Sequence, residues 1–118
     1  LDRSICFYRQ LGFDGHVKWH KGAYLSLGDL WLCLTLGEPD PTSDYRHIAF
    51  DIASENFSAF VQRLIAAGVP QWQCNSSEGD SMYILDPDGH QLEIHAGSLA
   101  TRLASLKRKP YKGLQWIS

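Results

Sequence analysis

Two residues in the second half of the chain, His47 and Glu93, are of types that commonly bind divalent metal ions. Glu93 stands between Leu92 and Ile94, so strand alternation places its carboxylate on the face opposite these apolar neighbours. A carboxylate in a buried sheet requires solvent, a cationic partner or a metal ion. His47 stands within a strand-like run in the same way. Together they are two of the three ligands in a His/His/carboxylate set, which suits Mn²⁺, Fe²⁺ or Zn²⁺.

A turn sets the cross-strand neighbours of Glu93. In Asp86-Pro87-Asp88-Gly89, proline suits the second position of a type I turn and glycine suits the left-handed position that follows. A three-residue hairpin loop at this point joins two antiparallel strands. It predicts three cross-strand pairs, which are Asp86 with His90, Tyr83 with Glu93, and Ser81 with His95.

Two other groups of side chains could bind ions. The segment 75–81 (NSSEGDS) is dense in oxygen ligands and can wrap a cation through hydroxyls and carbonyls. Arg102 lies beside the apolar face of a predicted helix, where an arginine can point a fork of donors into a site.

Each candidate also has a plainer interpretation that the residues leave open. His47 can be a core histidine bonded to a backbone carbonyl, with Glu93 solvated. The 75–81 segment can be an ordinary polar loop, and Arg102 can extend to solvent.

The elements that position these residues follow from hydrophobic spacing and turn residues. The first half predicts a helix and three strands, followed by a loop over 37–43. The predicted first-half elements are a helix at 1–11 ended by Gly12, and strands at 16–20, 23–27 and 30–36. The second half predicts a strand at 45–52, a helix with Ser54 as N-cap and Gly68 at its end, strands at 81–85 and 90–96, and a helix at 99–107.

The two halves form a weak internal repeat. The second half reads as a strand, a helix and further strands, and the first half reads as the same module without its opening strand. We therefore expect a strand before Leu1 and a chain that is clipped at its N-terminus.

Composition bounds the kind of protein. The chain has 118 residues, which predicts one domain. A formal net charge of −2 provides no long-range positive field for nucleic acid. The longest apolar run, 30–36, is far short of a membrane span of about 20 residues. The charge and the short apolar run therefore predict neither a nucleic-acid nor a membrane partner. Three cysteines without a CxxC motif predict reduced thiols and a cytoplasmic protein.

Four stretches spread over nearly the whole chain resemble one family. They are GAYLSLGDLWLCL (22–34), SDYRHIAF (43–50), the segment 75–103 and KPYKG (109–113). They resemble the vicinal-oxygen-chelate (glyoxalase–bleomycin-resistance–dioxygenase) superfamily, and within it the fosfomycin-resistance glutathione transferases of the FosA type. The resemblance implies an α+β fold of paired βαβββ modules forming a cupped mixed sheet. The modules would be 1–37, lacking its opening strand, and 44–118 with its C-terminal helix, in a single domain over 1–118. It also implies a homodimer with exchanged modules.

The resemblance implies a role for each candidate residue. His47 and Glu93 resemble two of three Mn²⁺ ligands, the third being a histidine upstream of Leu1 that the other subunit supplies. The implied K⁺ ligands are Asn75, Ser77, Gly79 and Ser81. The implied substrate-binding groups are Ser77, Tyr83 and Arg102 for the phosphonate, with Trp31 and Tyr45 lining the pocket. Tyr24 resembles a tyrosine near the glutathione thiol, so Tyr24 and Arg102 are the implied catalytic residues.

The implied activity is addition of glutathione to the epoxide of fosfomycin, with Mn²⁺ and K⁺ as cofactors and antibiotic resistance as the result. The alternatives are a fosfomycin hydrolase, another thiol transferase, a glyoxalase- or dioxygenase-like enzyme, or a non-enzymatic drug-binding protein of the bleomycin-resistance type. One residue departs from the family pattern. Gln73 follows Trp72 where the family usually has a substrate-binding lysine. This departure predicts weaker phosphonate binding, or a shifted loop in which another cation substitutes.

Overall fold

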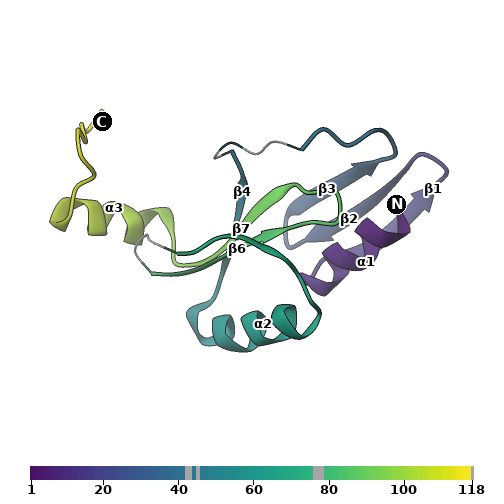
Figure 1. The fold of residues 1–118 in the computed structure, drawn as a ribbon, viewed down its shortest axis with the longest axis horizontal. Coiled ribbons are helices and arrows are strands. Elements are labelled where there is room, and N and C mark those ends of the chain that lie inside the picture. Colours follow the sequence, from purple (N-terminus) through teal and green to yellow (C-terminus); the bar gives the residue numbers. More distant parts are fainter. Residues whose placement is uncertain (42–43, 45, 76–78, 118) are drawn as a thin grey trace.

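Two β-sheets, joined by the segment that follows residue 35, form the frame of the molecule (Figure 1). The computed structural model describes residues 1–117 except 42, 43, 45 and 76–78. The described part measures 50 × 29 × 26 Å, because the C-terminal helix extends away from both sheets (Figure 1). None of the helices in this part has the length and apolar composition needed to cross a membrane.

The first sheet follows an N-terminal helix. Helix α1 (Asp2–Gln10) ends at Leu11, and Gly12 takes a positive φ of 109° just after it, as predicted. The sheet has the order β1-β2-β3 with antiparallel neighbours. Its strands are β1 (Asp14–Trp19), β2 (Gly22–Leu27) and β3 (Leu30–Thr35).

The second sheet is mixed and has the order β4-β7-β6-β5. Strand β4 is parallel to β7, and the other neighbours are antiparallel. The elements are β4 (Ile48–Ile52), α2 (Ser54–Ala66), β5 (Gln71–Gln73), β6 (Asp80–Leu85) and β7 (Gln91–Ala96). Helix α3 (Leu99–Arg108) follows. The order strand, helix, three strands is a βαβββ module, so the predicted α+β fold is confirmed.

The two faces of the second sheet differ in chemistry. One face is apolar, and α2 packs against it (Figure 1). The buried residues of this face and of the helix are Phe60, Leu64, Met82, Ile84, Leu92 and Ile94. Alternation turns the residues between them toward the other face, where polar side chains collect. This arrangement places the candidate site on the face opposite α2.

The hairpin register predicted from the Asp86 turn is confirmed. Tyr83 pairs with Glu93, Ser81 pairs with His95, and the backbone N–H of Asp86 donates to the carbonyl of His90 at 3.0 Å. The sequence therefore predicted which residues lie beside the candidate carboxylate.

Three details of the predicted elements are wrong. The strand expected over 45–52 begins only at Ile48. The side-chain amide of Gln91 donates hydrogen bonds to the backbone carbonyls of Asp44 and Arg46, at 2.6 and 2.9 Å, in place of a neighbouring strand. His47 therefore lies just before β4 rather than within it. The N-cap of α2 is Ala53, and Ser54 is its first helical residue. The short strand β5 was not predicted.

A buried hydrogen bond joins α1 to the β6–β7 turn. The hydroxyl of Tyr8 donates to Oδ2 of Asp86 at 2.8 Å, and Oδ1 of the same carboxylate accepts from the backbone N–H groups of Asp88 and His90. Burial, followed by the bond to Asp86, raises the pKa of Tyr8 well above its usual range. The bond thus couples the first half of the chain to the hairpin that carries Glu93.

Replacing Tyr8 with phenylalanine should lower the free energy of unfolding by about 1–3 kcal/mol, because a buried carboxylate loses a donor. The sign of the pH effect follows from the raised pKa. Above about pH 10 the unfolded chain releases the phenol proton while the folded chain keeps it, so wild-type stability falls there and the variant lacks this component. Urea unfolding between pH 7 and 11 measures both effects. Tyr111→Phe, at an exposed tyrosine, is the matched control, and equal losses in the two variants would contradict the role of the bond.

Candidate metal centre

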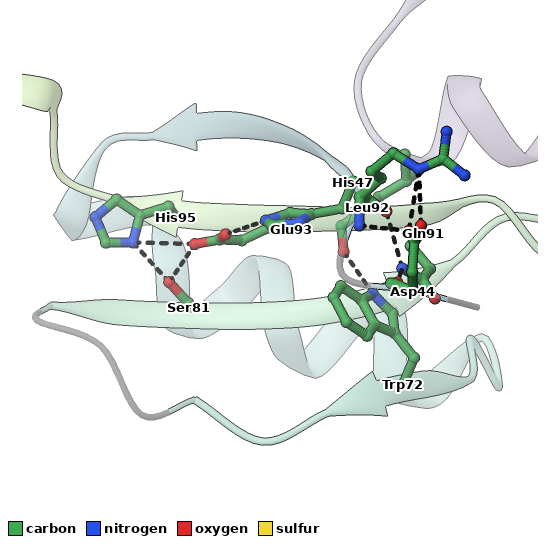
Figure 2. A network of polar contacts seen from close by, with 9 residues as sticks. Asp44, His47, Trp72, Ser81, Gln91, Leu92, Glu93 and His95 are labelled. Atoms are coloured by element: carbon green, nitrogen blue, oxygen red, sulfur yellow. Dashed lines mark hydrogen bonds and ion pairs between the residues drawn. The ribbon is translucent and has the colours of Figure 1, made fainter. Parts of the chain in front are cut away.

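His47 and Glu93 face each other on the polar side of the second sheet (Figure 2). Nε2 of His47 lies 2.9 Å from Oε1 of Glu93, and their side chains are only 16% and 8% exposed. The segment before β4 supplies the histidine, and the middle of β7 supplies the carboxylate. The interpretation of Glu93 as a solvated side chain is therefore wrong.

The second oxygen of Glu93 is also bonded. Oε2 accepts from the hydroxyl of Ser81 at 2.9 Å, and that hydroxyl lies 2.6 Å from Nδ1 of His95. Nδ1 of His95 lies 3.6 Å from the same carboxylate oxygen. Figure 2 shows Ser81 on the neighbouring strand, bonded to both residues of β7. Every oxygen of this buried carboxylate thus has a partner, as burial of a charge requires.

Two aromatic side chains, Trp72 and Tyr83, pack beside the His47 imidazole. The indole of Trp72 lies 5.5 Å from its ring centroid, and the ring of Tyr83 lies 6.1 Å from it. Trp72 is itself anchored, because Nε1 donates to the carbonyl of Leu92 at 3.0 Å (Figure 2). Sequence reasoning missed Trp72 as a site residue. The only feature of the sequence that pointed to Trp72 was its position directly before Gln73, where the family usually has a lysine.

The donor set fits a divalent cation in part. A nitrogen and an oxygen 2.9 Å apart have the spacing of neighbouring ligands that each lie about 2.1 Å from one ion. Imidazole with carboxylate is a donor pair that Mn²⁺, Fe²⁺ and Zn²⁺ accept. Two ligands do not complete such a site, so further ligands must come from outside this pair.

A second cluster, Asp86, Asp88 and His90, brings three potential ligand atoms within 4.8 Å of one another. The carboxylates are already engaged. Both oxygens of Asp86 are bonded as described above, and Asp88 accepts from Arg3 at 3.0 Å and from Ser4 at 3.3 Å. These bonds hold the turn against α1, and the cluster is structural.

The other predicted site residues are spread over the second sheet, the loop before β6, helix α3 and the first sheet. Gln73 of β5, Tyr83 of β6 and Glu93 of β7 are direct cross-strand neighbours and form one row. In the predicted K⁺ loop the amide of Asn75 donates to the carbonyl of Gly79 at 2.8 Å. Two predicted residues, Tyr45 and Ser77, lie outside the described residues. Arg102 is half-buried in the first turns of α3.

Tyr24 and Trp31 belong to a separate aromatic row on the first sheet. Tyr24 lies 4.8 Å from the ring of Trp19 and 5.0 Å from that of Trp31, which is 68% exposed. Within the described ranges no ring contact joins this row to His47. Tyr24 and Trp31 thus belong to the first sheet, whereas the metal pair belongs to the second.

Comparisons with known proteins agree with this geometry. Residues 1–94 match the model of the Glyoxalase/Bleomycin resistance protein/Dioxygenase superfamily. Glutathione transferase FosA of Serratia marcescens is 50% identical over 124 residues, which covers 100% of this chain and 88% of that protein. Metallothiol transferase FosB of Shouchella clausii is 37% identical over 118 residues, which covers 92% and 80% respectively.

A solved structure extends the likeness to three dimensions. A mutant of the fosfomycin resistance protein FosX from Listeria monocytogenes, complexed with Mn(II) and 1S,2S-dihydroxypropylphosphonic acid, superposes with a TM-score of 0.79. It is 29% identical, and the match covers 87% of this chain and 88% of that one. The chain therefore belongs to the Glyoxalase/Bleomycin resistance protein/Dioxygenase superfamily, and within it to the fosfomycin-resistance proteins.

Proposed function

We propose that this protein is a metal-dependent glutathione transferase that opens the epoxide of fosfomycin and so confers resistance. The observation that carries the proposal is the buried pair of His47 and Glu93, 2.9 Å apart, in a chain 50% identical over its whole length to a glutathione transferase FosA. Imidazole and carboxylate are ligand types that a divalent cation accepts, so the pair favours a metal-dependent enzyme over a drug-binding protein without a metal.

His47 and Glu93 would hold a Mn²⁺ ion, together with a ligand that is not among the described residues. A bound divalent cation supplies Lewis-acid stabilisation of the oxygen released when the epoxide opens. Mn(II) in the FosX structure supports this choice of metal. Tyr83, Ser77 and the guanidinium of Arg102 would hold the phosphonate dianion in line for thiol attack. The predicted K⁺ site would use Asn75, Ser77, Gly79 and Ser81.

The protein would act as a homodimer with exchanged modules, 1–37 and 44–118, in one domain per chain. Two exposed surfaces support this. The aromatic row carries Trp19 and Trp31, and α3 with the tail exposes Leu99, Trp116 and Ile117. Apolar surface of this extent is usually covered by a partner. A second copy would bring Tyr24 and Trp31 to the metal pair of its partner. A monomer in analytical ultracentrifugation would contradict this.

The three exposed cysteines form no disulfide, which supports a reducing, cytoplasmic location. There the abundant thiol glutathione is available as co-substrate, and we infer that it is the nucleophile.

The chemical identity of the product tests this proposal. The full-length protein, loaded with Mn²⁺ and K⁺, is incubated with fosfomycin and equal concentrations of glutathione and cysteine, and the products are separated by mass. The glutathione adduct should dominate. A cysteine adduct or the diol formed with water would replace the proposal with another thiol transferase or a hydrolase, and unchanged fosfomycin bound to the protein would indicate a drug-binding protein.

Replacing Gln73 with lysine should lower the KM for fosfomycin about tenfold, because one hydrogen bond to a charged group contributes on the order of 1.5 kcal/mol. Gln73 is half-buried and is the cross-strand neighbour of Tyr83, which in turn neighbours Glu93. A longer cationic side chain at position 73 would therefore extend toward the proposed substrate site. Gln71→Lys is the matched control, since Gln71 pairs with Ile84 instead. Initial rates against fosfomycin concentration decide, and an unchanged or raised KM in Gln73→Lys would contradict the expectation.

A further inference from the structure

His95 is the one member of the buried network to which the proposed function gives no role. It is 9% exposed, and it lies two residues after Glu93 on the same face of β7. Its Nδ1 atom approaches both Ser81 and Glu93 (Figure 2). A buried imidazole aimed at the carboxylate of a proposed metal ligand calls for a physical explanation.

The number of protons available to Glu93, Ser81 and His95 determines which atom donates in each hydrogen bond between them. An ionised carboxylate only accepts, so the hydroxyl of Ser81 must donate its single proton to Oε2 of Glu93. The Ser81 oxygen then has no proton left for His95, although it lies 2.6 Å from Nδ1. Nδ1 of His95 must therefore carry a proton and donate it to Ser81.

A second observation leads to the same tautomer. Nδ1 of His95 also lies 3.6 Å from Oε2 of Glu93. A bare nitrogen there would point its lone pair at a carboxylate oxygen, which is unfavourable, whereas an N–H is attracted to it. The chain of donors therefore runs from His95 through Ser81 to Glu93.

The backbone holds the imidazole in this orientation. A Cβ added at Gly97 would lie 2.8 Å from Nε2 of His95, and one added at Gly79 would lie 3.3 Å from Cε1. Two glycine backbones thus close on the ring, one on the segment leading to Ser81 and one next to the N-cap Ser98 of α3. Larger residues at these positions would collide with the ring, so the two glycines leave the room that this orientation of His95 needs.

We propose that His95 is a positioning residue for the metal centre. Its Nδ1–H holds the oxygen of Ser81, and the hydroxyl of Ser81 in turn holds Oε2 of Glu93, which leaves Oε1 as the oxygen turned toward His47. The inference rests on the proposed function in one respect, that Glu93 binds a metal. It adds a residue outside the ligand set whose donor orients a ligand, an arrangement on which metal affinity commonly depends.

The first test needs no metal. In ¹⁵N NMR of the full-length, metal-free protein, the Nδ1 atom of His95 should be protonated, and Ser81→Ala should reduce its preference for that state. A wild-type His95 that carries its proton only on Nε2 would overturn the inference.

The second test compares asparagine and leucine at position 95, which are close in size but differ in hydrogen-bonding groups. Asparagine can replace the Nδ1–H donor and leucine cannot. In calorimetric titration with Mn²⁺, His95→Leu and Ser81→Ala should each raise the Kd about 10- to 100-fold, and His95→Asn should stay within about threefold. Both variants break the same chain of hydrogen bonds from His95 to Glu93. The double variant should therefore lose less Mn²⁺ binding free energy than the sum of the two single losses. His20→Leu, at an exposed histidine, should bind as the wild type does.

The outcomes separate the two proposals. Equal Mn²⁺ affinity of wild type and His95→Leu would overturn the positioning role while leaving the metal site intact. A wild type that binds no Mn²⁺ would overturn the metal site and the role together, and the NMR result then still decides whether the donor chain exists. If His95→Leu fails to fold, as judged by its thermal melt, Ser81→Ala carries the same comparison.

Discussion

Replacing Glu93 with glutamine is expected to abolish metal-dependent activity while the fold survives. Glutamine keeps the shape of the side chain but gives up the charge and one acceptor oxygen. The carboxylate lies 2.9 Å from His47, so the change removes one of the two ligands that this chain supplies. Losses of 10- to 100-fold follow even when an outer hydrogen-bond partner of a metal ligand is removed, so the loss of a ligand should exceed about 100-fold.

The fold should tolerate this change because the amide can still bond to its neighbours. Ser81 can donate to the amide oxygen as it does to Oε2, and removing a buried charge lowers the desolvation cost. Mn²⁺ titration and the thermal melt measure the two properties separately. Full Mn²⁺ affinity in Glu93→Gln would contradict the ligand role, whereas loss of the cooperative melt would show that the carboxylate is needed for folding.

Truncating Leu64 to alanine should have the opposite pattern, with a large loss of stability and retained chemistry. Leu64 is fully buried in α2 and packs in the core on the apolar face of the second sheet. Removing a buried leucine side chain beyond Cβ costs about 2–5 kcal/mol, including the cavity it leaves. His47 and Glu93 lie on the opposite face of this sheet, so the folded variant should keep its Mn²⁺ affinity.

Ile65 is the matched control for this prediction, because it is the next residue of the same helix and is 52% exposed. Ile65→Ala should change the free energy of unfolding by only about 0.5 kcal/mol, as surface substitutions usually do. Urea unfolding at one fixed protein concentration compares them, since assembly adds to apparent stability. Similar losses for the two variants would mean that α2 does not bury Leu64 in solution.

The part of the site that local sequence chemistry controls was predictable. The Asp86 turn determines the hairpin register, and the register places Ser81, Tyr83 and His95 around Glu93. These pairs follow from turn geometry and two-residue alternation, which act over a few residues. The sequence could not predict which of His95 and Ser81 donates the hydrogen bond between them, because the answer depends on distances between side chains.

Contacts between distant segments were less predictable. His47 was expected within a strand but lies before it, since the side-chain amide of Gln91 on β7 donates to the carbonyls of Asp44 and Arg46, which precede His47. Strand β5 has three residues, too few for a pattern of alternation, and so the packing of Trp72 on His47 was missed. Residue types suggested His47 and Glu93 as a pair of metal ligands but left a plainer interpretation open, because 46 positions separate them; the family resemblance decided in favour of the metal.

The most direct test of the proposed chemistry is the metal dependence of glutathione adduct formation. The full-length protein is stripped with a chelator, dialysed, and assayed by mass for the fosfomycin–glutathione adduct before and after Mn²⁺ is restored, with K⁺ present throughout. We predict no adduct above the uncatalysed background in the stripped protein and full recovery with Mn²⁺. Undiminished adduct formation by the stripped protein, or none after Mn²⁺ is restored, would contradict a metal-dependent transferase built on His47 and Glu93.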